Sequence, residues 1–283
     1  MQELDSLFEN IDDEDEKEIV YPEYTRKDFL KDVYMSEEDY NRLTGVLCNK
    51  KNIISQGAPG VGKTYLAKRL AYSIMGVKDV ERVKMVQFHQ SYSYEDFIGA
   101  EVLRSEDGGT YVTTKQGVFL KYIEKVKSDP DKSNKYLLVI DELNRGNIAE
   151  IFGESILALD RNYEASLSKE YEDVGTLSIP HNLYIVATMN TSDRNIAFLD
   201  LAIRRRFAFV PLLPNYDFLS EEVIFQDFDL GNILKQINQR IIDTLKDPEL
   251  ILGQSYFIPK TNESGKYICL LYTSDAADDL IGV

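Results

Sequence analysis

Short apolar segments recur along the chain and alternate with stretches whose apolar positions are spaced three or four residues apart. The segment Tyr136–Ile140 is apolar throughout, which is typical of a parallel strand buried on both faces. Strands that alternate with helices predict a parallel α/β sheet covered by helices on both sides. Five segments are predicted to be its strands: Asn52–Gln56, Val83–His89, Tyr136–Ile140, Leu183–Thr188 and Phe207–Leu213.

Helical spacing is found between these strands and after the last of them. A capping box at Ser36–Asp39 predicts a helix that runs to about Asn49, and Gly76 is expected to end the helix over Tyr65–Met75. Further helices are expected over Gly117–Val126 and, as one amphipathic helix, over Asn147–Leu159. The remaining segments are a polar and aromatic loop at Gln90–Gly99, a short hairpin arm at Tyr111–Thr114, a loop at Ser128–Asn134 and a mainly helical subdomain over Asn215–Lys246.

The segment between the first strand and its helix matches the phosphate-binding pattern G-x-x-x-x-G-K-[ST]. Its residues are Gly57, Ala58, Pro59, Gly60, Val61, Gly62, Lys63 and Thr64. Glycines allow a tight turn whose N–H groups converge on phosphate oxygens, and the helix N-terminus adds a partial positive charge. Lys63 is expected to reach the β and γ phosphates, and the Thr64 hydroxyl to bind Mg²⁺. The strand and helix on either side favour this interpretation over a chance glycine-rich turn.

Two carboxylates follow the buried strand Tyr136–Ile140, where open α/β sheets place their ligands. Adjacent carboxylates at such a place are costly unless a cation is near, so Asp141 is the expected Mg²⁺ partner. Glu142 is then the expected general base for an attacking water. The alternative is a strand end that simply meets solvent. Asn190 ends the neighbouring strand and could position the water or sense the γ-phosphate.

Three consecutive arginines, Arg204, Arg205 and Arg206, precede the last predicted strand. Taken alone, such a run is more often a solvated or nucleic-acid-binding face. Because it follows a polar loop and leads into a core strand, a directed role is favoured here. An arginine presented to a neighbouring subunit's γ-phosphate would stabilise charge in the transition state.

Composition indicates a soluble globular protein and limits its partners. The net charge is −16, which argues against a chain that grips nucleic acid over its whole surface. The chain has two cysteines and two histidines, which excludes a disulfide scaffold and argues against a Cys/His zinc site. The acidic N-terminus does not resemble a signal peptide, and no stretch is long enough to span a bilayer, so we expect a cytoplasmic protein with no membrane association.

Four motifs together resemble those of AAA+ ATPases: Gly57–Thr64, Ile140–Asn147, Met189–Arg194 and Leu199–Phe207. More narrowly, they are similar to McrB-like motor subunits of modification-dependent (type IV, 5-methylcytosine-specific) restriction systems. The segments Phe88–Phe97 and Gly253–Phe257 resemble that family too. The resemblance covers roughly residues 36–258.

The resemblance implies a role for each matching residue. Gly57–Thr64 would be Walker A, Asp141 and Glu142 Walker B, and Asn190 sensor 1. Arg205 would be the arginine finger with Arg206 as the second candidate, and Arg145 a further cationic contact near the phosphates. The resemblance also implies a five-stranded parallel αβα core, a hexameric ring, GTP as the usual fuel with ATP as the alternative, Mg²⁺, and an McrC-type nuclease partner through which the ring acts on DNA.

Two parts of the chain depart from the family pattern. Residues 1–25 hold ten Asp or Glu and one Lys, which predicts a disordered tail or a docking segment for a basic partner, and no DNA-reading module is evident before the core. Residues 269–283 resemble a translated sequencing-adapter tail, the alternative being an ordinary loop and short helix. The expected organisation is therefore a tail at 1–25, a core at 26–214, a partial helical lid at 215–268 and a non-native tail at 269–283.

The sequence leaves two other functions open. A MoxR-like ATPase that remodels protein partners would share the ring, and would prefer ATP. A nucleotide-gated assembly scaffold would bind nucleotide with little need for hydrolysis. The presence of Glu142 and of the arginine run favours a hydrolysing motor over the scaffold.

Overall fold

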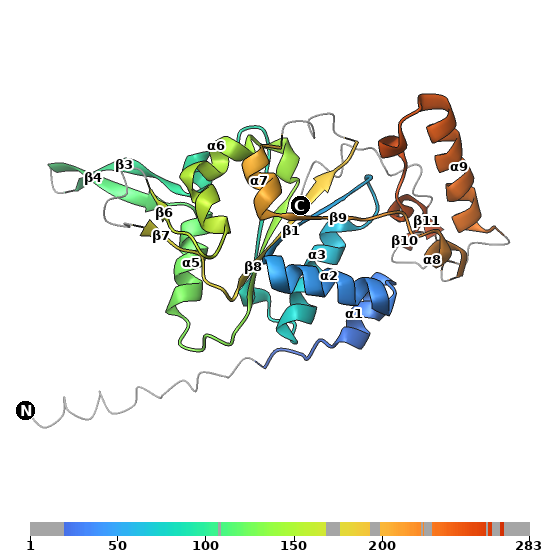
Figure 1. The fold of residues 1–283 in the computed structure, drawn as a ribbon, viewed down its shortest axis with the longest axis horizontal. Helices are drawn as coiled ribbons and strands as arrows, with labels where there is room; N and C mark the ends of the chain where they lie inside the picture. Colours follow the sequence, from blue (N-terminus) through green and yellow to red (C-terminus); the bar gives the residue numbers. More distant parts are fainter. Residues whose placement is uncertain are drawn as a thin grey trace, which may run out of the picture.

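The predicted strands form a single parallel sheet in the computed structural model (Figure 1), which describes residues 20–106, 109–167, 176–192, 199–221, 223, 228–258, 260–261 and 267–268. The strand order is β2-β5-β8-β1-β9, and every neighbouring pair is parallel. The strands are β1 (Asn52–Gly57), β2 (Val83–Gln87), β5 (Tyr136–Asp141), β8 (Leu183–Asn190) and β9 (Ala208–Pro211). The predicted five-stranded α/β fold is confirmed.

Helices cover both faces of this sheet, as its apolar strands require. Along β5 the side chains alternate: Leu137 and Val139 pack into one core cluster, and Leu138 and Ile140 into the other. The first cluster includes residues of α1 (Arg26–Val33), α2 (Glu37–Lys50) and α3 (Lys63–Met75). The second includes residues of α5 (Val118–Ser128), α6 (Ile148–Phe152) and α7 (Leu201–Arg206). The sheet is thus the middle layer of three.

Local signals set the ends of the helices next to the phosphate loop. The Ser36 hydroxyl caps α2 by accepting a hydrogen bond from the Asp39 amide at 3.1 Å. Gly76 ends α3 in the left-handed conformation, with φ of 81°. The predicted start of α2 and the predicted end of α3 are confirmed.

The last residues of the acidic N-terminal segment belong to the folded part of the chain. Tyr24 is 1% exposed, and Glu23 forms an antiparallel bridge with Val77. The Tyr24 hydroxyl donates to Asp32 at 2.8 Å, and Thr25 caps α1. The sequence places residues 1–25 in a disordered tail, but burial of an aromatic ring stabilises an ordered path for residues 22–25. Residues 1–19 lie outside the described part.

One predicted helix is broken. The segment predicted as a single helix over Asn147–Leu159 consists of α6 followed by a 3-10 helix over Gly153–Leu159. Gly153 has φ of 48°, and a Cβ at this position would lie 2.8 Å from the Tyr94 ring. The Tyr94 ring therefore occupies the space that a side chain at residue 153 would need in the observed conformation. The single-helix prediction is wrong, because the backbone of Gly153 leaves the α-helical conformation and the chain continues as a 3-10 helix.

The segment predicted as a loop at Gln90–Gly99 contains a helical turn, α4 (Tyr94–Phe97). Ser93 and Asp96 form a capping box at its start, and Phe97 is fully buried, with its ring stacked on Phe119 at 4.7 Å. The hairpin that follows is longer than expected, with β3 (Gly99–Glu106) paired to β4 (Gly109–Gln116). It projects from the body at the left of Figure 1. A second, short hairpin is formed by β6 (Ala165–Ser166) and β7 (Thr176–Leu177).

A helical unit follows the sheet, here called the lid (residues 215–258), and lies at the right of Figure 1. It contains α8 (Tyr216–Glu221) and α9 (Leu230–Leu245), which agrees with the predicted helical content. Buried Asn238 joins its parts, because its amide donates to the Leu252 carbonyl and its side-chain oxygen accepts from the Leu252 amide. The short strands β10 (Lys260–Thr261) and β11 (Tyr267–Ile268) come after the lid, and the suspected tail at 269–283 lies outside the described residues.

A buried polar network ties the start of β1 to α7. The Asn52 amide donates to the carbonyls of Leu159 (2.9 Å) and Arg206 (3.0 Å), and its side-chain oxygen accepts from Arg161 at 2.9 Å. Arg161 also donates to the carbonyls of Leu159 and Leu183. Burial lowers the pKa of the Arg161 guanidinium to about 10. The network joins the strand that carries the phosphate loop to the arginine helix.

Replacement of Asn52 by Ala is expected to lower the free energy of unfolding by about 1–3 kcal/mol, because the Arg206 carbonyl and one arginine N–H would lose a partner inside the protein. Urea denaturation measures this change. Asn162→Ala is the matched control, since Asn162 is exposed and its amide donates to Asp160. A loss no greater than that of the control would contradict the importance of the network.

None of the helices in the described part of the chain is both long enough and apolar enough to cross a membrane.

Candidate active site

The predicted site residues meet at the carboxyl edge of the sheet because their strands are neighbours. The phosphate loop follows β1, and the register of β1 with β8 places Gly57 opposite Asn190. On the other side of β8 lies β5, which ends at Asp141. Three strand ends thus bring together residues that are far apart in the sequence, at the edge where parallel sheets bind ligands.

The phosphate loop has the backbone conformation that its glycines allow. Gly60 and Gly62 have φ of 79° and 86°, in the left-handed region that side chains other than glycine rarely adopt. Directly after Gly62 the chain enters α3. The N-terminal N–H groups of α3 and its helix dipole favour an anion at this end.

Lys63 lies inside the loop and is 7% exposed. Its ammonium group donates to the carbonyls of Gly57 (3.0 Å) and Ala58 (2.8 Å). These contacts keep a positive charge next to the loop in a largely desolvated position, where its attraction for phosphate is strong.

Thr64 and Asp141 are in direct contact. The Thr64 hydroxyl donates to Asp141 Oδ1 at 2.8 Å, and the Thr188 hydroxyl donates to the same oxygen at 2.5 Å. A hydroxyl and a carboxylate beside a phosphate loop are the oxygen ligands that Mg²⁺ prefers. This pair therefore fits a magnesium ion.

Glu142 is held in an unusual backbone conformation, with φ of 54°, and its amide donates to the Thr188 hydroxyl at 3.1 Å. The Asn190 amide donates to both Glu142 carboxylate oxygens at 2.8 Å, and Arg145 Nε lies 3.4 Å from Oε2. Burial raises the pKa of Glu142, and the nearby positive charge of Arg145 opposes this rise. The residues predicted as base and sensor are thus hydrogen-bonded to each other.

Asn144 is a site residue that sequence reasoning did not single out, although it lies within a recognised motif. Its amide donates to the Asn190 carbonyl at 3.2 Å. Its side-chain oxygen is buried and has no hydrogen-bond partner in the described part of the chain. Asn144 therefore fixes the backbone of Asn190, whose side chain orients Glu142.

The arginines of α7 are not equivalent. Arg204 and Arg205 are exposed, whereas Arg206 is half-buried and its guanidinium donates to the Ala202 carbonyl at 3.0 Å. Asp200 caps the helix by accepting from the Ala202 amide. Of the two predicted finger residues, Arg205 is the one with its side chain open to solvent. Asp193 and Arg194, the end of the motif that begins at Met189, lie outside the described residues.

The lid touches the phosphate loop through a segment that carries no predicted site residue. The Gly253 amide donates to the Pro59 carbonyl and the Ser255 amide to the Gly60 carbonyl, each at 2.9 Å. The side-chain amide of Gln254 donates to the Val61 carbonyl at 3.0 Å. The segment Gly253–Phe257 was recognised in the sequence as similar to the family, but its contact with the phosphate loop was not predicted.

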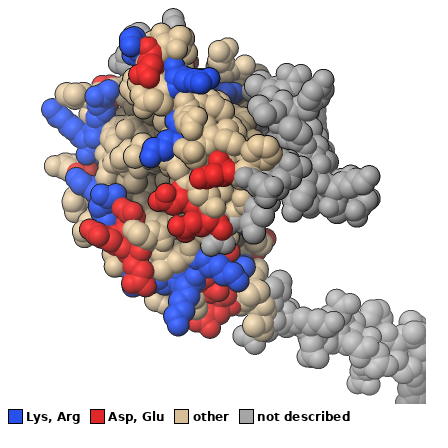
Figure 2. All heavy atoms as spheres, turned by 90° about the vertical axis from the view of Figure 1, so that its right-hand side faces the viewer, with Lys and Arg blue, Asp and Glu red and all other residues tan. Residues whose placement is uncertain are grey.

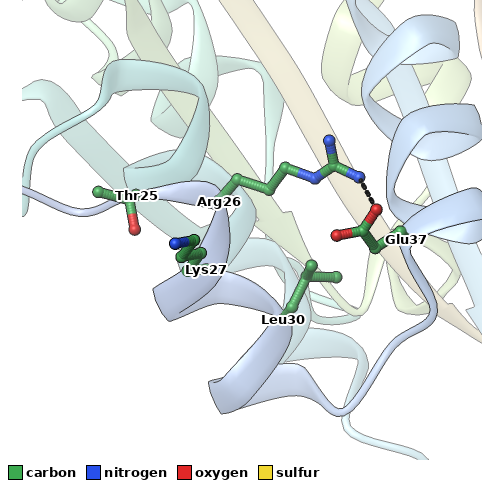
Figure 3. Close-up of a pocket in the computed structure, with 5 residues that line it drawn as sticks. All are labelled: Thr25, Arg26, Lys27, Leu30 and Glu37. Atoms are coloured by element: carbon green, nitrogen blue, oxygen red, sulfur yellow. Dashed lines mark ion pairs between the residues drawn. The ribbon is translucent and has the colours of Figure 1, made fainter.

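A surface groove of about 420 Å³ lies apart from these residues, along α1 and the start of α2 (Figure 3). Its lining residues are Thr25, Arg26, Lys27, Leu30 and Glu37. An ion pair of 3.0 Å joins Arg26 to Glu37, whose side chains are 40% and 75% exposed. Such an exposed pair contributes little to stability. None of the predicted site residues lines this groove.

The lid-side face of the molecule carries charges of both signs. Figure 2 shows acidic and basic side chains in separate small groups over this face. A single continuous basic surface is not seen on the described atoms of this view.

Comparison with known families identifies the group to which this arrangement belongs. Residues 52–207 match the family described as AAA domain (dynein-related subfamily). The chain belongs to this family of AAA domains. The match begins at β1 and ends directly after the arginine helix, so it contains the phosphate loop, the Asp141–Glu142 pair, Asn190 and the arginines.

Two curated relatives are subunits or components of restriction enzymes. The chain is 38% identical over 249 residues to the type IV methyl-directed restriction enzyme EcoKMcrB subunit of Escherichia coli (strain K12), over 83% of this chain and 53% of that protein. It is 26% identical over 195 residues to the type II restriction enzyme BsuMI component YdiS of Bacillus subtilis (strain 168), over 56% of each chain. The chain spans about half the length of these relatives.

A solved structure from Cytophaga hutchinsonii ATCC 33406 is also similar, at 17% identity and a TM-score of 0.39. The match covers 80% of this chain and 58% of that chain. The predicted membership of the AAA superfamily and the predicted similarity to McrB subunits are confirmed by the family match and by the Escherichia coli relative.

Proposed function

We propose that this chain is a Mg²⁺-dependent nucleoside triphosphatase that uses GTP, with ATP as the alternative, as the motor subunit of an McrBC-like DNA restriction system. One observation carries the proposal of hydrolysis. Glu142 is held by Asn190 beside the Thr64–Asp141 pair, at the sheet edge that bears the phosphate loop. The restriction role is supported by the similarity to the restriction-enzyme subunit of Escherichia coli. The preference for GTP rests on the resemblance of the sequence motifs to those of McrB-like motor subunits.

In this proposal the phosphate loop binds the triphosphate. The loop amides and Lys63 would interact with phosphate oxygens, and Thr64 and Asp141 would hold Mg²⁺, whose charge would partly neutralise that of the phosphates. Asn190 orients the Glu142 carboxylate through two hydrogen bonds. Each carboxylate oxygen keeps a second lone pair, so Glu142 can still accept a proton from a water that attacks the γ-phosphorus. The bond from that phosphorus to the bridging oxygen breaks in this step, and the nucleoside diphosphate leaves with the oxygen.

The other residues act on charge and assembly. Arg145, 3.4 Å from Glu142, keeps a positive charge near the base. Arg205 of a neighbouring subunit would stabilise charge on the transferred phosphoryl group, which requires a ring, proposed here to be hexameric. We propose that a McrC-like nuclease subunit stimulates hydrolysis, and that DNA is engaged through this assembly in the cytoplasm. Residues 26–214 would form the motor core, and residues 215–268, which contain the lid and the short strands after it, a partial helical subdomain.

Hydrolysis of GTP and of ATP by the purified chain, with and without a candidate nuclease subunit, tests the proposal. Preferential GTP turnover that the partner increases would support it. Turnover of ATP alone, stimulated by a protein client, would favour a MoxR-like remodelling ATPase. Binding without turnover of either nucleotide would favour an assembly scaffold.

Replacement of Lys63 by Ala is expected to weaken nucleotide binding by roughly 10- to 100-fold, because a charge-assisted contact to phosphate is lost. Isothermal titration with a non-hydrolysable GTP analogue measures the change. Lys68→Ala on the same helix is the control, since Lys68 lies more than one turn from the loop. Equal affinity of the Lys63 variant and the wild type would contradict the proposed phosphate site.

A further inference from the structure

The lid segment Gly253–Ser255 lies against the phosphate loop and holds three of its successive carbonyls. The amides of Gly253 and Ser255 donate to Pro59 and Gly60, and the side chain of Gln254 donates to Val61. The donor–acceptor distances are 2.9, 2.9 and 3.0 Å. These are ordinary, well-formed hydrogen bonds.

The approach is so close that it requires glycine on both sides. A Cβ on Gly253 would lie 2.0 Å from the Gly60 carbonyl carbon, and a Cβ on Gly60 would lie 2.5 Å from the Tyr256 ring. A side chain at either position would push the lid segment away from the loop. The close contact therefore depends on glycine at residues 60 and 253.

These bonds determine where the loop amides point. In a planar trans peptide the C=O and the following N–H point in opposite directions. The carbonyls of Pro59, Gly60 and Val61 point to the lid. The N–H groups of the residues that follow each of them in the chain, residues 60–62, therefore point away from the lid. Lys63 holds the carbonyls of Gly57 and Ala58 in addition. With the carbonyls held in this way, the loop presents N–H groups rather than oxygens to an anion.

Gln254 also connects the loop to the rest of the lid. Its side-chain oxygen accepts from the Asn215 amide at 3.2 Å, which leaves its NH₂ group to face the Val61 carbonyl. The Asn215 side chain in turn donates to the Tyr34 carbonyl at 2.9 Å. Because the backbone partners are one donor and one acceptor, the orientation of the Gln254 amide is determined.

We propose that Gln254 is a positioning residue for the nucleotide phosphates, and that residues 253–255 of the lid complete the phosphate loop from its outer side. It acts through Val61 and does not touch the substrate. The inference rests on the proposed nucleotide site. It predicts that the position of the lid and the affinity for phosphate are coupled. The hydrogen bonds that hold the lid against the phosphate loop are the same bonds that orient the loop amides toward the phosphates.

Two variants test the role of Gln254 in the full chain. Gln254→Glu keeps the length and the acceptor for Asn215 but loses the donor to Val61, and Gln254→Met loses both without adding charge. Both are expected to raise the KM for GTP, and the Kd for a non-hydrolysable GTP analogue, by about tenfold, with kcat changed less than twofold. Gln236→Glu is the control, because Gln236 is exposed on α9 and the substitution adds the same charge.

Hydrogen exchange gives an independent measurement. In the wild type, nucleotide analogue is expected to slow exchange of the Gly253 and Ser255 amides, and this protection is expected to be reduced in both Gln254 variants. A thermal melt of each variant without nucleotide, within a few degrees of the wild type, would separate the effect from unfolding.

Three outcomes would overturn the inference. Equal affinity in wild type and both Gln254 variants would exclude positioning by this residue. Weakened binding in Gln254→Glu but not in Gln254→Met would assign the effect to the added charge. No nucleotide binding by the wild type itself would refute the proposed function, and the inference with it.

Discussion

Replacement of Glu142 by Gln is expected to lower the rate of nucleotide hydrolysis by about 10³-fold and to leave nucleotide binding intact. Glutamine keeps the size of the side chain and an oxygen that can accept from the Asn190 amide, but it cannot take a proton from water. The substitution therefore removes the proposed base with little change in shape. Steady-state phosphate release and analogue binding by titration measure the two quantities separately.

The control for this variant is Glu150→Gln, because Glu150 is exposed on α6 and the charge change is the same. Hydrolysis at the wild-type rate in Glu142→Gln would remove Glu142 from the mechanism. Cellular restriction activity adds a further distinction. A motor loses its function with this substitution, whereas an assembly scaffold that needs only nucleotide binding keeps it.

Replacement of Arg205 by Ala is expected to lower hydrolysis by about 10³- to 10⁵-fold in the assembled ring, which is the range for loss of an arginine finger. Arg205 is exposed near the end of α7, and in the proposed ring its guanidinium would contact the phosphates bound by a neighbouring subunit. Arg204→Ala is the matched control, since Arg204 is exposed on the same helix. A smaller loss is expected for Arg206→Ala, because Arg206 already donates to Ala202 within its own helix.

Mixing of two inactive variants tests whether Arg205 acts between subunits. In a ring that contains Arg205→Ala and Glu142→Gln subunits, some interfaces combine an intact base with an intact arginine from the neighbour. Hydrolysis is expected to reappear on mixing in proportion to such interfaces. If no activity returns while both variants still assemble, the arginine acts within its own subunit or has a structural role.

Much of the fold and of the candidate site follows from local sequence. The strand β5 was predicted from an apolar run, α2 from the Ser36 cap, and the end of α3 from Gly76. The phosphate loop was predicted from its own spacing of glycines, lysine and threonine. These signals are readable because propensity, capping and burial on both faces of a strand act over a few residues.

Other features depended on contacts between distant segments. The predicted helix is broken at Gly153, against which the Tyr94 ring packs, and the burial of Tyr24 orders residues that a composition argument places in a tail. The hydrogen bonds from Asn190 to Glu142 join residues 48 positions apart. The bond from Gln254 to Val61 spans 193 positions.

The sequence thus contained the local chemistry of the site: a loop shaped for phosphate, a pair of carboxylates after a buried strand, and a run of arginines. The tertiary structure determined which of these groups interact. Asn190 is hydrogen-bonded to Glu142, and the lid is hydrogen-bonded to the carbonyls of the phosphate loop. It also left Arg205 exposed and Arg206 half-buried. The physical reason is that a hydrogen bond or a close packing contact depends on distances of a few ångströms. Packing of the whole chain sets those distances, and periodicity along the sequence does not specify them.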